Sequence, residues 1–210
     1  MPKLTTRTLR ILTHLGGVFP FAWIVFDYFT DNLTFNPIQD VTLRTGKAAL
    51  IFLVLSLAAT PVNFLFRYPP ALAVRKALGL YAFFYVSLHL LIFVGWDYVW
   101  DPNLIAEAIL EKRYALVGFV SFLILLPLAI TSTKGWQKRL GKKWKRLHRW
   151  VYLAAGLAIV HYVWLVKSDI REPLAYGAVL GLLLLLRVPV VKSWIGTGKK
   201  SLRRVRNSVN

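Results

Sequence analysis

Six long apolar windows constrain the fold of this chain more than any other feature of the sequence. A helix needs about 20 predominantly apolar residues to span a bilayer. Of the 210 residues 57% are hydrophobic and only 17% are charged, a balance typical of integral membrane proteins. We therefore predict an all-α polytopic membrane protein, a six-transmembrane-helix bundle that forms a single membrane domain over residues 1–210. The predicted spans cover roughly residues 9–29, 46–66, 77–96, 114–131, 150–166 and 173–191.

The charged residues divide unevenly between the two sides of such a bundle. One side carries 21 of the 27 Lys and Arg residues. It consists of the N-terminal tail, the loops 67–76 and 134–149, and the last-span end with the basic tail 192–210. All nine acidic residues fall on the other side. The positive-inside rule then places both termini in the cytoplasm, as expected for a bacterial inner-membrane protein. The basic residues of the cytoplasmic side account for most of the formal charge of +18, so we expect no nucleic-acid binding.

The loop 134–149 reads KGWQKRLGKKWKRLHR and continues the basic side. Trp136, Leu140, Trp144 and Leu147 recur at helical spacing with lysines and arginines between them. This pattern predicts an amphipathic helix in the membrane interface. Attraction to anionic membrane lipids explains its charge; a docking surface for an acidic cytosolic electron donor is the alternative.

The sequence contains no cysteine, and its one methionine is Met1. These absences exclude disulfides, iron–sulfur clusters, thiolate ligation of haem and covalent haem attachment through CxxCH. If the chain binds iron, histidine is the obvious ligand.

Four histidines lie in or at the border of the spans: His14, His89, His148 and His161. Polar residues at membrane depth are costly and usually face a bundle interior, where they mark function. His89 and His161 both lie about 17 to 18 Å from the cytoplasmic boundary, on two helices that run outward. Two imidazoles at matched depth can clamp a planar tetrapyrrole from both faces, and two axial nitrogens suit an iron that cycles electrons.

The other two histidines lie near the cytoplasmic boundary. We interpret His14 as an interhelical hydrogen-bond partner, which is the ordinary role of a single membrane histidine. His148 is either an interfacial histidine or a ligand of a second cofactor. Because 13 residues separate it from His161, an ideal helix turns about 220° between them, so the two side chains are not expected on one face.

The segments TSTKGWQKRLGKKWKRLHRWVYLAAGLAIVHYVW, LGLYAFFYVSLH and TPVNFLFR resemble MsrQ (formerly YedZ), a family of haem-binding inner-membrane subunits within the ferric reductase-like transmembrane proteins. The resemblance implies b-type haem, one or two per chain, and FMN. It implies electron transfer from the quinone pool to MsrP, a periplasmic molybdopterin subunit that reduces protein methionine sulfoxide. The haem histidines of the family match His89 and His161, and His148 matches a third functional histidine. A cytosolic flavin reductase is an alternative donor.

The family's flavin cannot be placed on the chain, because the sequence has no GxGxxG fingerprint. Basic residues on the acidic side are candidates to pair with haem propionates, and interfacial anchoring is their ordinary alternative. We assign Arg44 and Arg113 to the cofactor; the full set is Arg44, Lys47, Lys112, Arg113 and Arg171.

Two other function classes remain as alternatives to an electron-transfer subunit. A transporter or proton relay would use histidines as titrating groups and predicts carboxylates inside the spans, but all nine acids lie in outer loops or at span edges. A transmembrane ferric or metal reductase like the eukaryotic relatives would need a cytosolic flavin and nicotinamide domain. The sequence up to Asn210 shows none, so we expect a separate donor and no catalytic residues in this chain.

Overall fold

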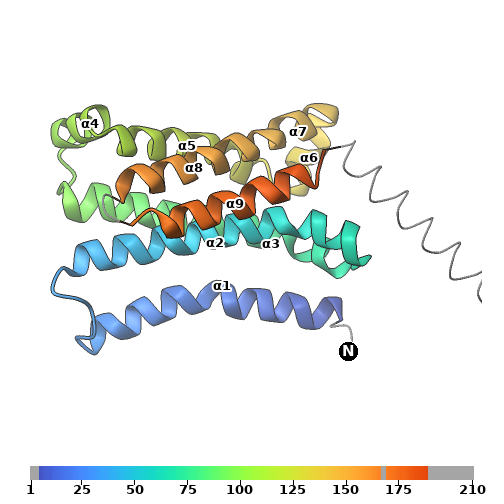
Figure 1. Cartoon of the computed structure of the whole chain (residues 1–210), viewed down its shortest axis with the longest axis horizontal. Helices are drawn as coiled ribbons and strands as arrows, with labels where there is room; N and C mark the ends of the chain where they lie inside the picture. The colour runs from blue at the N-terminus through green and yellow to red at the C-terminus, as the bar shows by residue number, and fades with distance from the viewer. Residues whose placement is uncertain (1–4, 167–168, 189–210) are drawn as a thin grey trace, which may run out of the picture.

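Helices form all the regular secondary structure in residues 5–166 and 169–188, the part of the chain that the computed structural model describes (Figure 1). The predicted basic tail 192–210 lies outside these residues, as do Lys3 and Lys167. The elements are α1 (Thr6–Phe29), α2 (Pro37–Phe66), α3 (Pro70–Ile92), the π-helix η1 (Phe93–Asp97), α4 (Pro102–Glu111), α5 (Arg113–Ile130), α6 (Lys134–Leu140), α7 (Lys142–Leu147), the 3₁₀ turn η2 (His148–Trp150), α8 (Val151–Leu165) and α9 (Arg171–Leu185).

Four of these helices are long and apolar enough to cross a membrane: α1, α2, α3 with its continuation to Asp97, and α5. They coincide with the first four predicted spans, which confirms an all-helical membrane protein. The fifth and sixth windows form α8 and α9, each of 15 residues. At 1.5 Å per residue such a helix is about 22 Å long, shorter than the roughly 30 Å hydrocarbon core. The six-span topology therefore stays a prediction.

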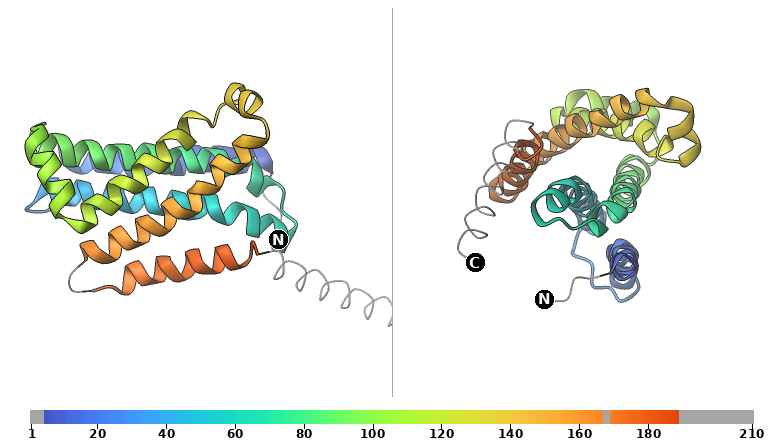
Figure 2. Two further views of the ribbon diagram at one scale, coloured as in Figure 1. Left: turned by 90° about the horizontal axis from the view of Figure 1, so that it is seen from above. Right: turned by 90° about the vertical axis from the view of Figure 1, so that its right-hand side faces the viewer.

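Two antiparallel helix pairs form the centre of the bundle. The most extensive packing is between α2 and α3 and between α5 and α8, and α9 lies against α8 and α2. α1 lies along one side of the bundle, where it packs on α3 and α2 (Figures 1 and 2). Small side chains allow the close approach of the central helices: Ala82 on α3 and Ala154 and Ala155 on α8 are at most 2% exposed.

Tyr85 joins α1 to the centre of the bundle. Its side chain is completely buried. The hydroxyl donates to the Gly17 carbonyl at 2.7 Å and accepts from the Phe21 N–H at 3.0 Å. In an uninterrupted helix these two backbone groups would bind each other, so the Tyr85 hydroxyl is inserted between them. The insertion lies next to Pro20, which has no N–H to donate within α1.

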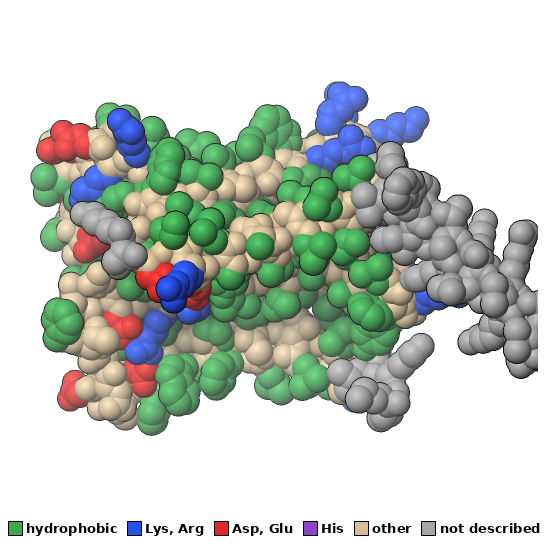
Figure 3. Space-filling model, in the orientation of Figure 1, with side chains coloured by type: hydrophobic (Ala, Val, Ile, Leu, Met, Phe, Trp, Pro, Cys, Tyr) green, Lys and Arg blue, Asp and Glu red, His purple; other side chains and the backbone are tan. Residues whose placement is uncertain are grey.

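The two ends of the bundle differ in charge (Figure 3). Acidic side chains gather at the end where α4 and the α1–α2 connection lie, here called the acidic end. Basic side chains without acidic neighbours gather at the opposite end near α6 and α7, here called the basic end. This is the segregation read from the sequence. α3 and α8 both run from the basic end to the acidic end (Figure 1).

Two details of the prediction were wrong, and one helix was not predicted. The loop 134–149 is not one amphipathic helix: Gly141, with φ +49° and ψ −122°, divides it into α6 and α7. L residues rarely adopt that conformation, which is why a glycine stands at the break. The predicted loop 67–76 is mostly the first turns of α3, which begins at Pro70. The outer connection after η1 contains α4, whose N-cap Asp101 accepts from the Asn103 and Leu104 N–H groups.

Candidate cofactor site

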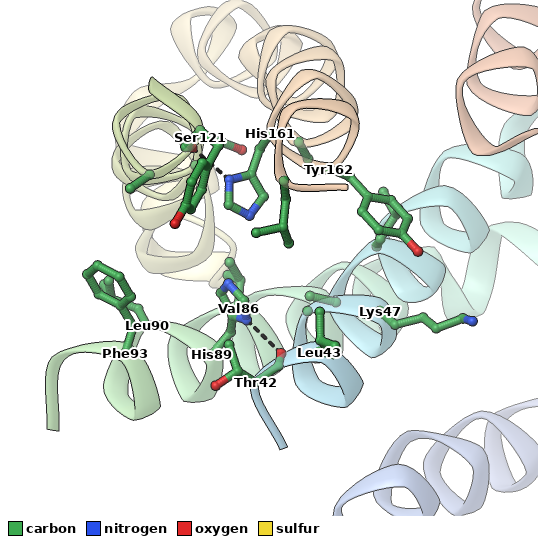
Figure 4. Close-up of a pocket in the computed structure, with 18 of the residues that line it drawn as sticks. Thr42, Leu43, Lys47, Val86, His89, Leu90, Phe93, Ser121, His161 and Tyr162 are labelled. Atoms are coloured by element: carbon green, nitrogen blue, oxygen red, sulfur yellow. Dashed lines mark hydrogen bonds between the residues drawn. The ribbon is translucent and has the colours of Figure 1, made fainter. Parts of the chain in front are cut away.

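A cavity of about 840 Å³ lies between the α2–α3 pair and the α5–α8 pair, where its walls bring together His89 and His161 (Figure 4). Ligand and cofactor sites commonly have volumes of about 300 to 1,000 Å³, mostly apolar walls and a few converging polar groups. The walls here fit that description. They include Leu50, Leu53, Ala82, Val86, Leu125 and Ala158.

The two histidine rings meet across this cavity, as their matched depth predicted. Their centroids are 6.0 Å apart and their planes are nearly perpendicular, at 86°. Figure 4 shows the rings projecting toward each other from α3 and α8. Imidazole nitrogens bind metal ions at about 2.0 Å, so two rings at this separation could hold one metal ion between their nitrogens. The observed separation fits an iron held between the two rings.

Each ring is oriented by a hydrogen bond to a backbone carbonyl. His89 Nδ1 lies 2.9 Å from the Thr42 carbonyl oxygen, and His161 Nδ1 lies 2.7 Å from that of Tyr114. A carbonyl oxygen only accepts, so Nδ1 carries the proton in both rings. Nε2 of each ring is then a bare nitrogen donor facing the cavity, the arrangement that orients metal-ligating histidines in general.

The two halves of the site are built in the same way. In each half the carbonyl acceptor lies 47 residues before its histidine, and a glycine follows the acceptor by four residues. A Cβ atom at Gly46 would come within 3.1 Å of the His89 ring, and one at Gly118 within 2.6 Å of His161 Nδ1. The missing side chains therefore make room for both imidazoles. The two histidines were identified from the sequence, whereas the glycines at equal spacing from the two carbonyls were the overlooked signal.

Basic side chains line the cavity toward the acidic end, and they are already paired. Arg44 binds Asp27 and also donates to Asp40 through Nε at 2.8 Å. Lys47 forms an ion pair with Glu172 of α9. Lys112 Nζ donates to the Tyr98 hydroxyl at 2.6 Å. Three of the five predicted propionate partners thus lie on the cavity wall.

The other two predicted cations lie elsewhere. Arg113 begins α5 with an exposed side chain and is not part of the cavity wall. Arg171 has a side chain that is 93% exposed, and its Nε lies 4.0 Å from Asp169. This geometry therefore gives no support to the assignment of Arg113 to the cofactor. The assignment of Arg44 stays a prediction, and the Arg44 side chain lies on the cavity wall beside Asp27 and Asp40.

The remaining histidines are not brought to this cavity. His148 Nε2 lies 3.1 Å from Thr131 Oγ1, and its ring stacks on Trp144 with centroids 4.0 Å apart. Burial, with the positive charge of Arg75, lowers the pKa of His148 below its ordinary value. His14 Nδ1 lies 3.0 Å from the Tyr81 hydroxyl, which agrees with its reading as an interhelical hydrogen-bond partner. The structure does not pair His14 or His148 with another histidine.

Comparison with known proteins agrees with the all-helical membrane fold. Residues 45–159 match the family profile described as ferric reductase like transmembrane component. The chain is 44% identical over 188 residues to a protein of Rhodospirillum rubrum named "Protein-methionine-sulfoxide reductase heme-binding subunit MsrQ", covering 89% of this chain and 90% of that one. A protein of the same name from Xanthomonas euvesicatoria is 42% identical, with 90% of each chain covered.

Another relative of that name, from Xanthomonas oryzae, is 39% identical over 98% of this chain and 94% of its own length. No solved structure matches the chain. Identity at this level over nearly the whole length, together with the family profile, means that the chain belongs to the MsrQ family of ferric reductase-like transmembrane proteins.

Proposed function

We propose that this protein is a membrane electron-transfer subunit that holds b-type haem between His89 and His161 and serves a protein-methionine-sulfoxide reductase. The relatives are named as haem-binding subunits of such a reductase. The observation that carries the proposal is the pair of facing imidazoles, 6.0 Å apart and oriented by backbone carbonyls. Haem iron with two axial nitrogens supplies reversible one-electron transfer.

The residues of the chain position the group and shield it. The carbonyls of Thr42 and Tyr114 fix the tautomer and direction of each ring. Apolar walls on four helices limit the access of water, which affects the redox potential of such a site. Lys47 and Lys112 lie on the wall toward the acidic end, where cations can pair with carboxylates of a cofactor. Arg44 keeps its two acidic partners and adds positive charge beside them.

The charge asymmetry supports an orientation of the chain in the membrane, and the family resemblance implies the direction of electron flow. With six spans and both termini cytoplasmic, the acidic end faces the periplasm. The facing histidines then lie nearer the side on which MsrP, the periplasmic catalytic subunit, acts. Electrons come from the quinone pool at the basic end, with a cytosolic flavin reductase as the alternative donor. FMN remains part of the proposal without an assigned position.

Coupled reoxidation of the haem tests this function. The purified protein is reduced with dithionite, excess reductant is removed, and the reduced haem bands are followed after MsrP and a methionine-sulfoxide substrate are added. We expect reoxidation only when both are present, and a His161→Ala protein should show no haem bands to follow. Reduced bands that persist in the complete mixture, or wild-type protein without haem, would contradict the proposal.

A further inference from the structure

A second cavity, of about 540 Å³, lies between the facing sides of α1 and α3 toward the basic end. Most of its wall is apolar, with Val18, Phe21, Leu80 and Phe84 among the lining residues. Its polar residues are Arg10, Thr13, His14, Lys76 and Tyr81. Among the residues that the structure describes, no acidic side chain lines it.

α1 presents this cavity to lipid. Apolar side chains that line the cavity are themselves exposed on the outside of the bundle: Val18 is 53% exposed, Phe21 41% and Phe84 42%. A helix with so many exposed apolar residues is surrounded by lipid tails when it crosses a membrane. A ligand can therefore reach the cavity from the bilayer, which favours a lipid-soluble molecule with a small polar head.

A hydrogen-bonded pair of side chains provides the chemistry of the second cavity. His14 Nδ1 lies 3.0 Å from the Tyr81 hydroxyl, and the two rings meet edge to face with centroids 5.9 Å apart. When Nδ1–H donates to the tyrosine oxygen, His14 Nε2 is a bare acceptor that can take a proton from a ligand hydroxyl. The close approach depends on Gly17, because a Cβ atom there would lie 2.3 Å from the Tyr81 ring.

An aromatic path leads from this pair to the cofactor site. Tyr81, Tyr85 and His89 recur every four residues along one side of α3, which spans about 12 Å along the helix axis. Phe52 of α2 lies beside both tyrosines, with ring centroids 5.6 Å from Tyr81 and 5.5 Å from Tyr85. The polar pair in the second cavity is thus connected by buried rings to one of the two facing histidines.

We propose that the α1–α3 cavity binds the head of a membrane quinol, that His14 and Tyr81 receive it, and that electrons pass along the Tyr81–Phe52–Tyr85 path toward His89. Oxidation breaks both O–H bonds of the quinol. Its two protons pass to His14 Nε2 and then to water at the basic end. Its two electrons would pass one after the other to the haem that the proposed function places between His89 and His161, and the first electron would leave for the periplasmic subunit MsrP before the second arrives. The inference rests on that proposed function.

The test uses the full-length haem protein in lipid nanodiscs and a decyl-substituted benzoquinol as reductant. The rate of haem reduction by the quinol is compared with the total haem that dithionite reduces. We expect His14→Ala and Tyr81→Phe to slow quinol-driven reduction about tenfold or more while dithionite-reducible haem stays unchanged. Leu15→Ala, on the lipid side of α1 next to His14, should behave as the wild type.

Two adjacent glycines provide a matched pair of variants for the shape of the cavity. Gly17→Ala should displace Tyr81 and raise the KM for quinol, whereas a Cβ atom at Gly16 meets nothing within 4 Å and Gly16→Ala should leave KM unchanged. Equal quinol rates in the wild type, His14→Ala and Tyr81→Phe would overturn the inference, as would reduction that needs added FMN instead of quinol. Both results leave haem binding intact, whereas loss of haem from the wild type is a failure of the proposed function itself.

Discussion

His161 lies so close to Gly118 that a Cβ atom at residue 118 would come within 2.6 Å of its Nδ1 atom. Gly118→Ala should therefore push the ring from its carbonyl acceptor and remove most of the bound haem. Gly46→Ala meets His89 at 3.1 Å and should have a smaller effect. Haem per polypeptide in the purified protein measures both. Gly156→Ala on α8, where a Cβ atom meets nothing within 4 Å, should keep full haem content.

The Tyr85 hydroxyl should contribute to the packing of α1. Tyr85→Phe removes the acceptor of the Phe21 N–H and the donor to the Gly17 carbonyl, which should lower the free energy of unfolding by about 1 to 2 kcal/mol. Denaturation in mixed detergent micelles gives this value. Tyr28→Phe, at a side chain that is 59% exposed, serves as the control, and equal stabilities of the two variants would count against the role of the hydroxyl.

The ion pair between Lys47 and Glu172 predicts a pH dependence of the contact between α2 and α9. The hydrogen bond from Lys47 holds the pKa of Glu172 below its ordinary value of 4.5. A carboxyl with a lowered folded pKa contributes stability that is complete above the ordinary pKa and is lost as the pH falls through the folded value. Acid unfolding of the wild type should therefore include this loss as the pH falls below about 4.5, and Glu172→Gln should lack it.

Both side chains of this pair are about half exposed, at 49% and 45%, so water screens their interaction and the effect should be small. The measurement is the difference in thermal midpoint between wild type and Glu172→Gln as a function of pH. A difference that does not change with pH would show that the ion pair does not stabilise the fold.

The break between α6 and α7 should depend on the backbone of Gly141. Its φ of +49° with ψ of −122° is a conformation that costs other residues about 1 to 3 kcal/mol, although a Cβ atom there would meet nothing within 4 Å. Gly141→Ala should therefore make residues 134–150 more sensitive to limited proteolysis. Gly135→Ala lies inside α6 and should be neutral or slightly stabilising. Equal cleavage of both variants would contradict the strain at Gly141.

Much of the fold was predictable because hydrophobic length and charge segregation act over whole segments. The first four windows became helices long enough to cross a membrane, and the windows at α8 and α9 became shorter helices. Helix ends were less predictable, since capping decides them locally. Asn36 caps α2 and Pro37 begins it, well before the apolar window at Gly46. Gly141 likewise breaks a pattern whose hydrophobic spacing continues through it.

The candidate site was predictable only in part. The positions of His89 and His161 along two parallel helices predicted that both lie at one level of the bundle. In the structure their rings lie next to each other. The orienting carbonyls of Thr42 and Tyr114 could not be read from side-chain chemistry, because any residue supplies a backbone carbonyl. The ion pairs of Arg44 and Lys47 depend on how α1 and α9 pack against α2, which hydrophobic pattern alone does not fix.

The most direct measurement is the reduced-minus-oxidised absorption spectrum of purified wild-type protein beside His89→Ala, His161→Ala and His148→Ala, with haem counted per polypeptide. We expect b-type haem bands in the wild type, loss of these bands in both His89→Ala and His161→Ala, and their retention in His148→Ala, whose ring binds Thr131 outside the cavity. Full haem content in either His89→Ala or His161→Ala would contradict the assignment of the two facing histidines as the ligands.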